Sequence, residues 1–505
     1  MKAMSRWVCL ILALLMIIGI FVGCGSTSSD GKDQETKQGT GDKETTPEET
    51  ETEESYLDNL PKTMDFNETE IRFLPVTTSH GNSVSMGDEA TGDNVQAAIM
   101  DRNGALSERL NISIELLPES GYHEMPATVA LAVSSGSDDY DVVIGYCSYD
   151  IGMAQNGYMI NLSNLNYLDF SQSYWGSEYM KAMSYKGINF WATGDISLTY
   201  TSFSYAFLVN SKLWKDFYSD QNIYQIVRDK EWTIELLGDF AAGVTTDLNG
   251  DGTKDRDDLW GFAMQDGHFI MAMATACGVQ YSQVNEDGDI EITLDSPETE
   301  DIYYVLHELF FDRENVTLML PLNEYDDVSK DMFAQDRLMF WNMNMRDLQK
   351  EEIRSMTSDY MVIPMPMMDD VQDDYYNMLQ DGVGIYGIPT TASHAKYDAI
   401  AATLEAMASM SAQSVLPAYY DYSLKFKYSR DEESGKMIDI IHDTIHADFA
   451  FIWGDNIGDI TWFMYRNMNK SSKSLASAFK SNRSVWETEL EALTEALDRF
   501  VDNGA

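Results

Sequence analysis

The fold is decided by the sequence between Glu70 and Ile144, which contains the β-rich runs EIRFL (70–74), ISIEL (112–116) and DVVI (141–144). A helical pattern separates the first two runs, because apolar side chains recur at near-helical spacing in NVQAAIMDRNGALSERL (94–110). Alternating β and α segments favour a parallel sheet with helices on its faces. We therefore expect an α/β protein.

Several signals downstream extend this pattern. A helical region opens at Lys212, Thr233 is the expected N-cap of a helix, and Ser296 precedes a proline and acidic residues as a second N-cap. The turn NEDGD (285–289) leads into an alternating strand and predicts a hairpin. Between residues 484 and 501 an apolar stripe predicts a helix packed on a core, since fewer than three heptads disfavour a coiled coil: Trp486, Leu490, Leu493, Leu497 and Phe500.

The composition predicts a folded protein and disfavours binding to nucleic acids and anionic membranes. The chain has 505 residues, which suggests two to four domains at roughly 100–200 residues per domain. It carries 83 acidic and 34 basic side chains, for a net charge of −49, and this charge repels nucleic acids and anionic membranes. With 44% hydrophobic residues, the chain has enough apolar material to form a packed core.

The N-terminus has the pattern of an export signal. Residues 7–22 (WVCLILALLMIIGIFV) are continuously apolar, but they are fewer than the about 20 residues of a membrane-spanning helix. The segment FVGCG (21–25) resembles the bacterial lipoprotein signal, with Phe21 where leucine is usual. It implies cleavage after residue 23 and acylation of Cys24, for example with palmitate. The alternative is an ordinary signal peptide followed by a chance cysteine.

Residues 24–57 are expected to be an acidic tether. Between Gly25 and Ser55 the chain consists almost entirely of Gly, Ser, Thr, Lys and acids, which cannot bury enough apolar surface to fold. A diacylated cysteine would hold the protein at the extracellular face of the membrane, in the Gram-positive manner, and the lipid would be its only membrane contact.

Two cysteines, Cys147 and Cys277, remain outside the signal region. They are too few for a disulfide framework, so we expect buried apolar fillers rather than a bridge. The chain contains no phosphate-binding loop, nucleophile elbow or zinc-protease motif, and its many carboxylates do not single out a glycosidase pair. His442 and His446 could share a helical face as metal ligands, but no third ligand matches them and a helix-surface position is favoured.

The strongest local motif is DLNGDGTKDRDD (247–258), which resembles a twelve-residue calcium loop. Gly252 stands at the sharp turn, and the final position holds aspartate rather than a bidentate glutamate. We expect a structural calcium ion here, the alternative being a solvated acidic loop, and no organic cofactor. The expected ligands are Asp247, Asn249, Asp251, Thr253 through its carbonyl, Asp255 and Asp258.

The body resembles the carbohydrate-type extracellular solute-binding proteins of bacterial ABC importers. The resemblance covers most of residues 70–410 and rests on segments that occur in the family's order: DYDVV (139–143), GYMINL (157–162), FLVN (207–210), WT (232–233) followed by the 247–262 region, FAQDRLMFW (333–341), IPMP (363–366) and YGIP (386–389). Asp336 stands where the family usually has glycine.

The resemblance implies a two-lobed, periplasmic-binding-protein-like (Venus-flytrap) α/β fold with hinge strands and extra C-terminal helices. After a signal peptide at 1–23 and the tether at 24–57, lobe one would comprise residues 58–198 and 359–410, and lobe two residues 199–358 and 411–505. A monomer would capture a solute in the inter-lobe cleft and deliver it by lobe closure to the membrane-embedded permease subunits.

Sugar recognition needs aromatic faces for C–H surfaces and planar polar groups for hydroxyls. The candidates near expected strand ends and crossovers are Tyr146, Trp175, Trp191, Asp195, Trp341, Arg346 and Trp453. An oligosaccharide is the expected solute and no catalysis is expected. The alternatives are uptake of a peptide or polyamine, a surface glycosidase, and a calcium-dependent adhesion module.

Overall fold

The computed structural model describes residues 56–77, 94–265, 267–321, 325–420 and 432–502. Residues 55–505 form a compact unit by themselves, separate from residues 1–54. The predicted signal peptide, Cys24 and nearly all of the predicted tether therefore lie outside the described residues. Among the described helices, none has the length and apolarity needed to cross a membrane.

One sheet, which defines lobe one, has the strand order β12-β4-β1-β2, with β3 pairing the end of β1. Its strands are β1 (Thr69–Thr77), β2 (Ile112–Leu116), β3 (Ser120–Gly121), β4 (Val142–Tyr146) and β12 (Gly384–Gly387). Strand β1 runs parallel to β2 and β4, as the sequence predicts, and β12 is antiparallel to β4. The surrounding helical segments are α2 (Asn94–Leu110), α3 (Met125–Ser135), α4 (Cys147–Asp150), η2 (Ile151–Met153), η3 (Leu162–Asn164), α5 (Ser177–Met183), η6 (His394–Lys396), α14 (Tyr397–Met410) and η7 (Ser411–Val415).

The second sheet, which defines lobe two, has the strand order β11-β5-β10-β6-β9. Its strands are β5 (Tyr205–Asn210), β6 (Trp260–Gln265), β9 (Thr317–Leu320), β10 (Leu338–Asn344) and β11 (Tyr360–Ile363). Strands β10, β6 and β9 are parallel, whereas β5 is antiparallel to β10 and β11. The surrounding elements are α7 (Ser211–Tyr218), α8 (Ile223–Arg228), α9 (Ile234–Val244), α10 (His268–Ala276), β7 (Ser282–Val284), β8 (Ile290–Ile292), α11 (Pro297–His307), η4 (Glu308–Asp312), α12 (Tyr325–Ala334), η5 (Met345–Gln349) and α13 (Glu351–Ser355).

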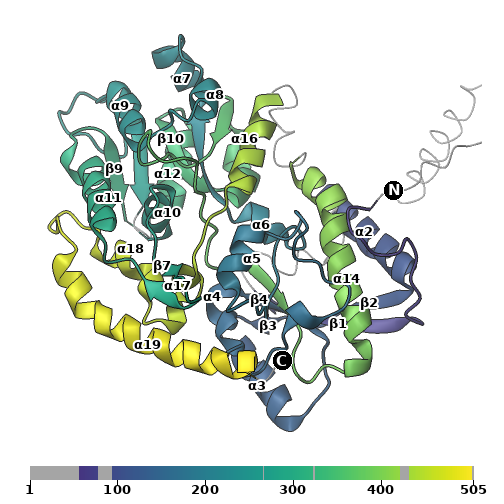
Figure 1. The fold of residues 1–505 in the computed structure, drawn as a ribbon. Helices are drawn as coiled ribbons and strands as arrows, with labels where there is room; N and C mark the ends of the chain where they lie inside the picture. Colours follow the sequence, from purple (N-terminus) through teal and green to yellow (C-terminus); the bar gives the residue numbers. More distant parts are fainter. Residues whose placement is uncertain (1–55, 78–93, 266, 322–324, 421–431, 503–505) are drawn as a thin grey trace, which may run out of the picture. The chain divides into compact units, whose positions relative to one another are not determined.

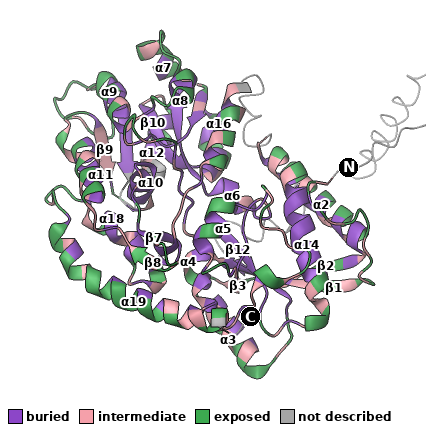
Figure 2. Cartoon of the chain, in the orientation of Figure 1, coloured by how far each residue is buried: buried purple, intermediate pink, exposed green. Residues whose placement is uncertain are grey.

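Both sheets are covered by helices, so their central strands are buried on both faces, whereas the edge strands β2 and β9 are partly exposed. Every residue of β5 and β10 is buried, and helices of the first lobe, such as α2 and α14, pack on each other. Figure 2 shows the buried residues concentrated in the strands and in the inner faces of the helices. Strands enclosed in this way lack the polar alternation of a half-exposed sheet.

Local start signals are confirmed at two helices and one hairpin. The Thr233 hydroxyl accepts the backbone N–H of Leu236, and the Ser296 hydroxyl accepts that of Thr299, with Pro297 at the first helical position. Strands β7 and β8 are antiparallel and flank the predicted NEDGD turn. These contacts depend only on neighbouring residues, which is why the sequence predicts them.

The chain crosses between the lobes along two segments that join their sheets. One runs from the end of β4 through α6 (Leu198–Ser202) to β5, and the other connects β11 to β12 through residues 364–383. Strand β11 pairs with β5, so residues 360–363 belong to the second sheet rather than to the lobe-one return expected from residue 359. After α14, the chain returns as α16 (Glu432–Asp443), which packs on β11.

The C-terminal region consists of α17 (Phe449–Ile452), η8 (Gly454–Asn456), η9 (Ile460–Trp462), α18 (Phe463–Asn467) and α19 (Ala476–Asp502). Helix α19 confirms the predicted apolar stripe, with Trp486, Leu493 and Leu497 at most 1% exposed. It contacts both lobes. Arg483 pairs with Asp295 before α11, and the Asp498 carboxylate lies 2.9 Å from Lys186 in lobe one. Figure 1 shows α19, in yellow, extending from the lobe-two elements toward α3.

Candidate functional site

The site begins where strand β4 of lobe one ends. In open α/β sheets, ligands bind beyond the carboxyl ends of the strands, and Tyr146 is the last residue of β4. The Asp150 carboxylate accepts the Tyr146 N–H at 2.6 Å, which fixes the backbone as it turns into α4. The Tyr146 ring then lies against Gly382, where a Cβ atom would approach the ring to 2.6 Å. Glycine at 382 therefore permits this close approach.

Asp381, on the second crossover, joins groups from both lobes. Its carboxylate accepts the Tyr146 hydroxyl at 3.2 Å and the Ser148 hydroxyl at 3.3 Å, both from lobe one. His268 Nε2, at the start of α10 in lobe two, lies 3.2 Å from the same carboxylate. Burial alone would raise the pKa of Asp381, but the hydrogen bonds and the His268 charge outweigh burial and lower it. The carboxylate is therefore ionised.

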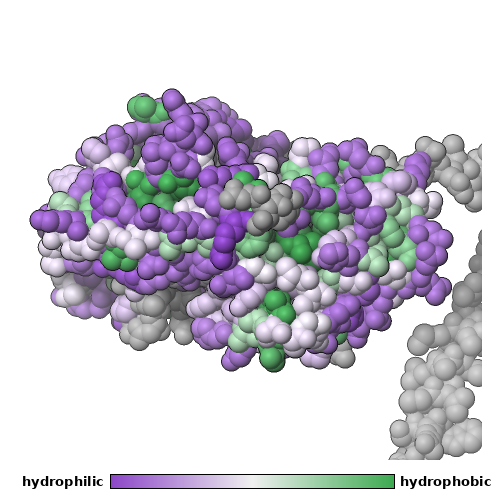
Figure 3. All heavy atoms as spheres, turned by 60° about the horizontal axis from the view of Figure 1, so that its bottom comes forward, coloured by the Kyte–Doolittle hydropathy of each residue, from purple (hydrophilic) through white to green (hydrophobic). Residues whose placement is uncertain are grey.

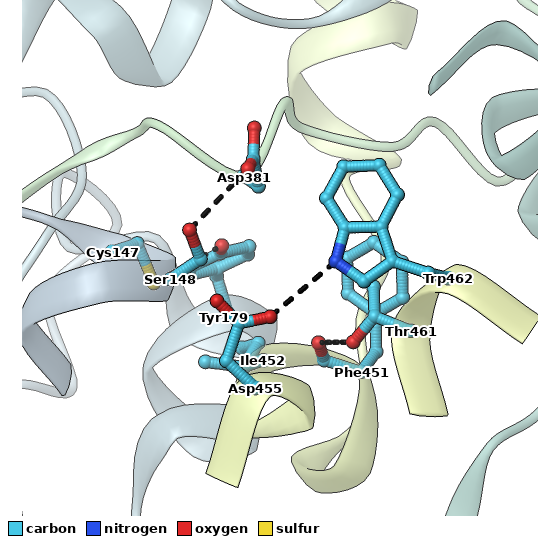
Figure 4. A pocket seen from close by; sticks show the side chains of 9 residues that line it. All are labelled: Cys147, Ser148, Tyr179, Asp381, Phe451, Ile452, Asp455, Thr461 and Trp462. Atoms are coloured by element: carbon cyan, nitrogen blue, oxygen red, sulfur yellow. Dashed lines mark hydrogen bonds between the residues drawn. The ribbon is translucent and has the colours of Figure 1, made fainter. Parts of the chain in front are cut away.

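A pocket opens beside Asp381, between lobe one and the C-terminal segment. That segment is itself packed on lobe two, since α18 contacts α10 and the Trp462 ring meets the His268 ring edge-on at 4.9 Å. The pocket volume is about 10 Å³, the room for about one water molecule. Figure 4 shows the Trp462 indole across the pocket from Ser148, with Asp381 and Asp455 at opposite ends of the view. The lining residues are Cys147, Ser148, Tyr179, Asp381, Phe451, Ile452, Asp455, Thr461 and Trp462.

Asp455 is the second carboxylate of the pocket. The residue as a whole is exposed, but partial burial of its carboxyl group raises its pKa to about 6, and the nearby carboxylates Asp459 and Asp381 add to this effect. Its hydrogen-bond donor is the Trp462 indole N–H, at 3.4 Å. The two acids of one pocket thus have pKa values moved in opposite directions by their surroundings.

Aromatic rings of lobe one gather next to Asp381. The rings of Tyr122 and Tyr149 lie 5.9 and 5.2 Å from that of Tyr146, and His123 packs between Tyr122 and Tyr149 at 4.1 and 5.0 Å. Tyr122 and Tyr149 are 38% and 41% exposed, so their rings are open to solvent. Aromatic faces beside carboxylates suit a ligand with both C–H surfaces and polar groups.

The four tryptophans that the sequence singles out lie in the core. Trp175, Trp191, Trp341 and Trp453 are at most 2% exposed. Three of them donate their indole N–H to protein oxygens: Trp175 to the Glu405 carboxylate, Trp191 to the Ile151 carbonyl and Trp453 to the Met183 carbonyl. The Trp341 ring packs on Phe333. None of the four presents a face to solvent in this structure.

The other three predicted residues lie at the junction of the lobes. Tyr146 belongs to the aromatic group beside the pocket. The Asp195 carboxylate lies 3.0 Å from His442 Nε2 of α16. The Arg346 guanidinium lies over the Phe203 ring at 5.1 Å, beside the first crossover. Their role in ligand binding stays a prediction.

Six residues of the site were not predicted from the sequence: Asp381, Asp455, His268, Tyr122, Tyr149 and Trp462. No local motif marks them, because they come from five separate segments of the chain. Two sequence features could have identified members of the site: Trp462 is one of the few tryptophans of the chain, and Asp381 lies just before the expected hinge strand.

The predicted calcium loop uses its side chains as acceptors for its own backbone. The Asp247 carboxylate accepts the N–H groups of Gly250 and Gly252, and the Asp258 carboxylate accepts those of Leu248 and Asp255. These backbone hydrogen bonds lower the pKa of Asp258. Within the described part of the chain, no group of three or more His, Cys, Asp or Glu side chains is arranged to hold a metal. Calcium binding stays a prediction.

The structure tests the predictions for the two cysteines and for the His442/His446 pair. Cys147 and Cys277 are free and buried, as predicted, and burial raises the pKa of the Cys147 thiol to about 12. His442 and His446 are both partly buried, and His446 lies beyond the end of α16: His442 bonds Asp195, and the His446 ring stacks on Tyr376 at 4.4 Å. The interpretation of both as surface residues of one helix was therefore wrong, because α16 packs on β11 and ends before His446.

Two helix-covered sheets, joined by crossovers with a pocket at their junction, form a two-lobed fold that the chain shares with solved sugar-binding proteins, one of them an ABC transporter solute-binding protein. UspC from M. tuberculosis matches with a TM-score of 0.55 and 15% identity, covering 84% of this chain and 100% of that one. A cyclo/maltodextrin-binding protein complexed with maltotetraose matches with a TM-score of 0.51 and 14% identity, over 86% and 97% of the two chains. An ABC transporter solute-binding protein from Thermotoga lettingae, bound with α-D-tagatose, matches with a TM-score of 0.50 and 15% identity. The match covers 84% of this chain and 100% of that one.

At the level of sequence, no protein-family model and no curated protein matches the chain.

Proposed function

We propose that the protein is the substrate-binding component of an ABC importer and captures a carbohydrate, most simply an oligosaccharide, between its lobes. The observation that carries the proposal is the pocket at Asp381, which takes its lining from lobe one, a crossover and the C-terminal segment packed on lobe two. A solute that touches both sides binds the closed arrangement better than the open one, and so shifts the population toward closure.

The size of the pocket supports a mechanism that depends on lobe movement. About 10 Å³ holds about one water molecule, so a sugar ring enters only if the lobes separate. The His268–Asp381 contact, which joins α10 to the second crossover, would break in that movement. Solute hydroxyls would then take over as donors to Asp381, with the aromatic group of Tyr122, Tyr146 and Tyr149 against the sugar faces.

Structures of similar fold contain maltotetraose and α-D-tagatose, which supports a carbohydrate solute for this chain as well. They are binding proteins, so we propose binding without turnover. The permease subunits of the importer would recognise the closed form. We further propose that the protein is a monomer anchored through Cys24 at the extracellular face of the membrane, with residues 24–57 as its spacer; the resemblance of FVGCG (21–25) to a lipoprotein signal supports the anchor.

Calorimetry and thermal-shift measurements on residues 55–505 test the carbohydrate proposal with mono- and oligosaccharides. We expect at least one glycan to bind and raise the melting temperature, without appearance of shorter products. Tyr122→Ala should weaken that binding, whereas Tyr304→Ala, an equally drastic change at an exposed tyrosine of α11, should not. Silence across all glycans together with a response to peptides would refute the proposal, and released sugar would indicate a glycosidase.

Membrane attachment is tested separately with the full chain. Cells expressing the Cys24→Ala variant should release the protein into the medium, and labelled palmitate should be incorporated only into the unchanged protein. Equal retention of both proteins in the membrane fraction would contradict a lipid anchor.

A further inference from the structure

A boundary between lobe one and the C-terminal segment runs from the pocket to the surface. At the pocket it separates Ser148 and Tyr179 of lobe one from Trp462. Further out it follows α5, where the Trp453 indole donates its N–H to the Met183 carbonyl at 3.2 Å. A movement that opens the pocket on this side therefore breaks the contacts of the whole boundary.

The boundary ends at a turn of lobe one that the last turns of α19 contact. In this turn Lys186 has a φ of 46°, in the left-handed region that residues other than glycine rarely adopt. Its ammonium group lies 2.9 Å from the Asp498 carboxylate of α19 and 3.4 Å from Asp289 of the β7–β8 hairpin. The Tyr185 hydroxyl donates to Asp498 at 3.0 Å. Strained residues persist where their surroundings hold them, and here both partners of Lys186 lie outside lobe one.

An aromatic pair lies beside these polar contacts. The Phe500 ring of α19 meets the Phe190 ring of lobe one edge-on, with the ring centroids 5.1 Å apart. A Cβ atom added at Gly157 of lobe one would lie 3.6 Å from the Phe500 ring, so the backbone there is also close to the helix. Edge-to-face rings attract each other beyond the effect of their burial. The end of α19 is thus held on lobe one by charge and by ring packing.

On its other side, the C-terminal segment is held more firmly by lobe two. The Asp448 carboxylate accepts the Tyr281 N–H and the Ser282 hydroxyl, both at 2.8 Å. The Tyr303 hydroxyl of α11 donates to the Asn467 carbonyl at 2.7 Å. These three lobe-two residues are at most 2% exposed, whereas the side chains of the ion pair with lobe one are 28% and 42% exposed. Because exposed ion pairs contribute little, the end of α19 separates from lobe one more readily than the segment separates from lobe two.

We propose that the end of α19 is a clasp, which holds the lobes closed and releases before a solute enters the pocket. The clasp consists of Asp498, Phe500, Lys186 and Phe190. The inference rests on the proposed function, because it concerns access to the same pocket. The residues that line the pocket include none of these four. Contacts that exist only in the closed arrangement shift the population toward it, so the clasp sets the fraction of open molecules without touching the solute.

Distances between two spin labels, measured by double electron–electron resonance on residues 55–505, test the proposal without any solute. The labels are attached at Leu131→Cys of α3 and Tyr304→Cys of α11, which are 70% and 55% exposed and lie in different lobes. The native cysteines of this part of the chain are buried, so the labels react at the introduced ones. In Phe500→Ala we expect the population at the longer, open distance to rise about two- to tenfold, the range that one aromatic pair supplies.

Two further variants complete the test. Asp498→Asn is a milder change that should raise the open population in the same direction, and it keeps the test decisive if Phe500→Ala fails to fold. Val501→Ala, at the neighbouring residue of the same helix, is 37% exposed and should leave the distances unchanged.

The outcomes separate this inference from the proposed function. Distances that are the same in the unchanged protein, Phe500→Ala and Asp498→Asn overturn the clasp, as does an equal change in Val501→Ala. The binding measurements with glycans decide the carbohydrate assignment independently, because the label distances are measured in the absence of any sugar.

Discussion

The contact between His442 and Asp195 predicts a pH-dependent stability that can be measured with one substitution. His442 lies on α16, which packs on the lobe-two strand β11, whereas Asp195 precedes α6 on the lobe-one side of the first crossover. The side chains are 16% and 7% exposed. The perturbation is His442→Gln, which keeps a hydrogen-bond donor but cannot carry a charge.

The contribution of these contacts to the free energy of unfolding follows from the surroundings of the His442 imidazole. Burial alone would lower the pKa of His442, but hydrogen bonds to the carboxylates of Asp195 and Asp443 raise it from 6.5 to about 9. That difference corresponds to about 3 kcal/mol at 1.36 kcal/mol per pKa unit. The Asp443 side chain is 75% exposed, so solvent screens part of the effect, and we expect about 2 kcal/mol.

The sign is set by the raised pKa in the folded state. The stabilisation is complete below about pH 6.5, where the histidine is protonated in both states, and it is lost as the pH rises through about 9. Asp439 also faces His442, and its pKa is raised by burial and by Asp443. The Tyr200 ring meets the imidazole edge-on at 5.6 Å, and burial raises the pKa of its hydroxyl, so this tyrosine stays neutral in the measured range.

The assay is urea unfolding of the original protein and His442→Gln between pH 6 and pH 10. The difference in their free energy of unfolding should fall by about 2 kcal/mol over this range, and charges shared by both proteins cancel in the difference. His394→Gln, at an exposed histidine of η6, is the control. A difference that is constant or grows with pH would refute the reasoning, as would a His442 titration midpoint below pH 7 by NMR.

Three further predictions concern the body of the protein. Asp58→Ala should cost about 3–5 kcal/mol in urea unfolding, because it strands the Arg109 guanidinium, whose side chain is 1% exposed and lies 2.6 Å from Asp58; a loss below 1 kcal/mol would contradict this. Asp498→Asn should cost only about 0.5 kcal/mol by the same assay, since its pair with Lys186 is partly exposed, and a loss above 2 kcal/mol would show that α19 depends on this contact. If the 247–258 loop binds calcium, CaCl₂ should raise the melting temperature, EDTA should reverse this, and Asp251→Ala should abolish it; an unchanged melting temperature would refute the site.

Much of the fold was predictable because its signals are local. The runs at 70–74, 112–116 and 141–144 became the parallel strands β1, β2 and β4, and their β propensity and the intervening helix depend on neighbouring residues only. The N-caps at Thr233 and Ser296 likewise need a hydroxyl within three residues of the N–H that it accepts. The two-lobed arrangement was inferred from the order of several weak motifs, not from any one of them.

The tryptophans show where sequence reasoning fails. An indole at an expected strand end can stack on a ligand or fill the core, and composition does not separate these outcomes. Trp175 is buried because the Glu405 carboxylate, 230 residues away in the chain, accepts its N–H. Such a partner is selected by the packing of α14 against lobe one, which no local pattern encodes.

The surface charge is a property that the sequence determined by itself. With 83 acids in the chain, hydrophilic side chains cover most of the face drawn in Figure 3, and hydrophobic ones occur there in separate areas. Charged side chains lie at the surface of any fold, because moving them out of water costs free energy.

The sequence alone determined the β and α segments, the helix starts, the apolar stripe of α19 and the expectation of an exported, acidic body, since each depends on residue type and spacing along the chain. Only the tertiary structure brought Asp381 to Tyr146, 235 residues away, and to His268, 113 residues away. These contacts exist because two crossovers place one sheet beside the other, and the balance of charge in a pocket is set by which side chains the crossovers bring together.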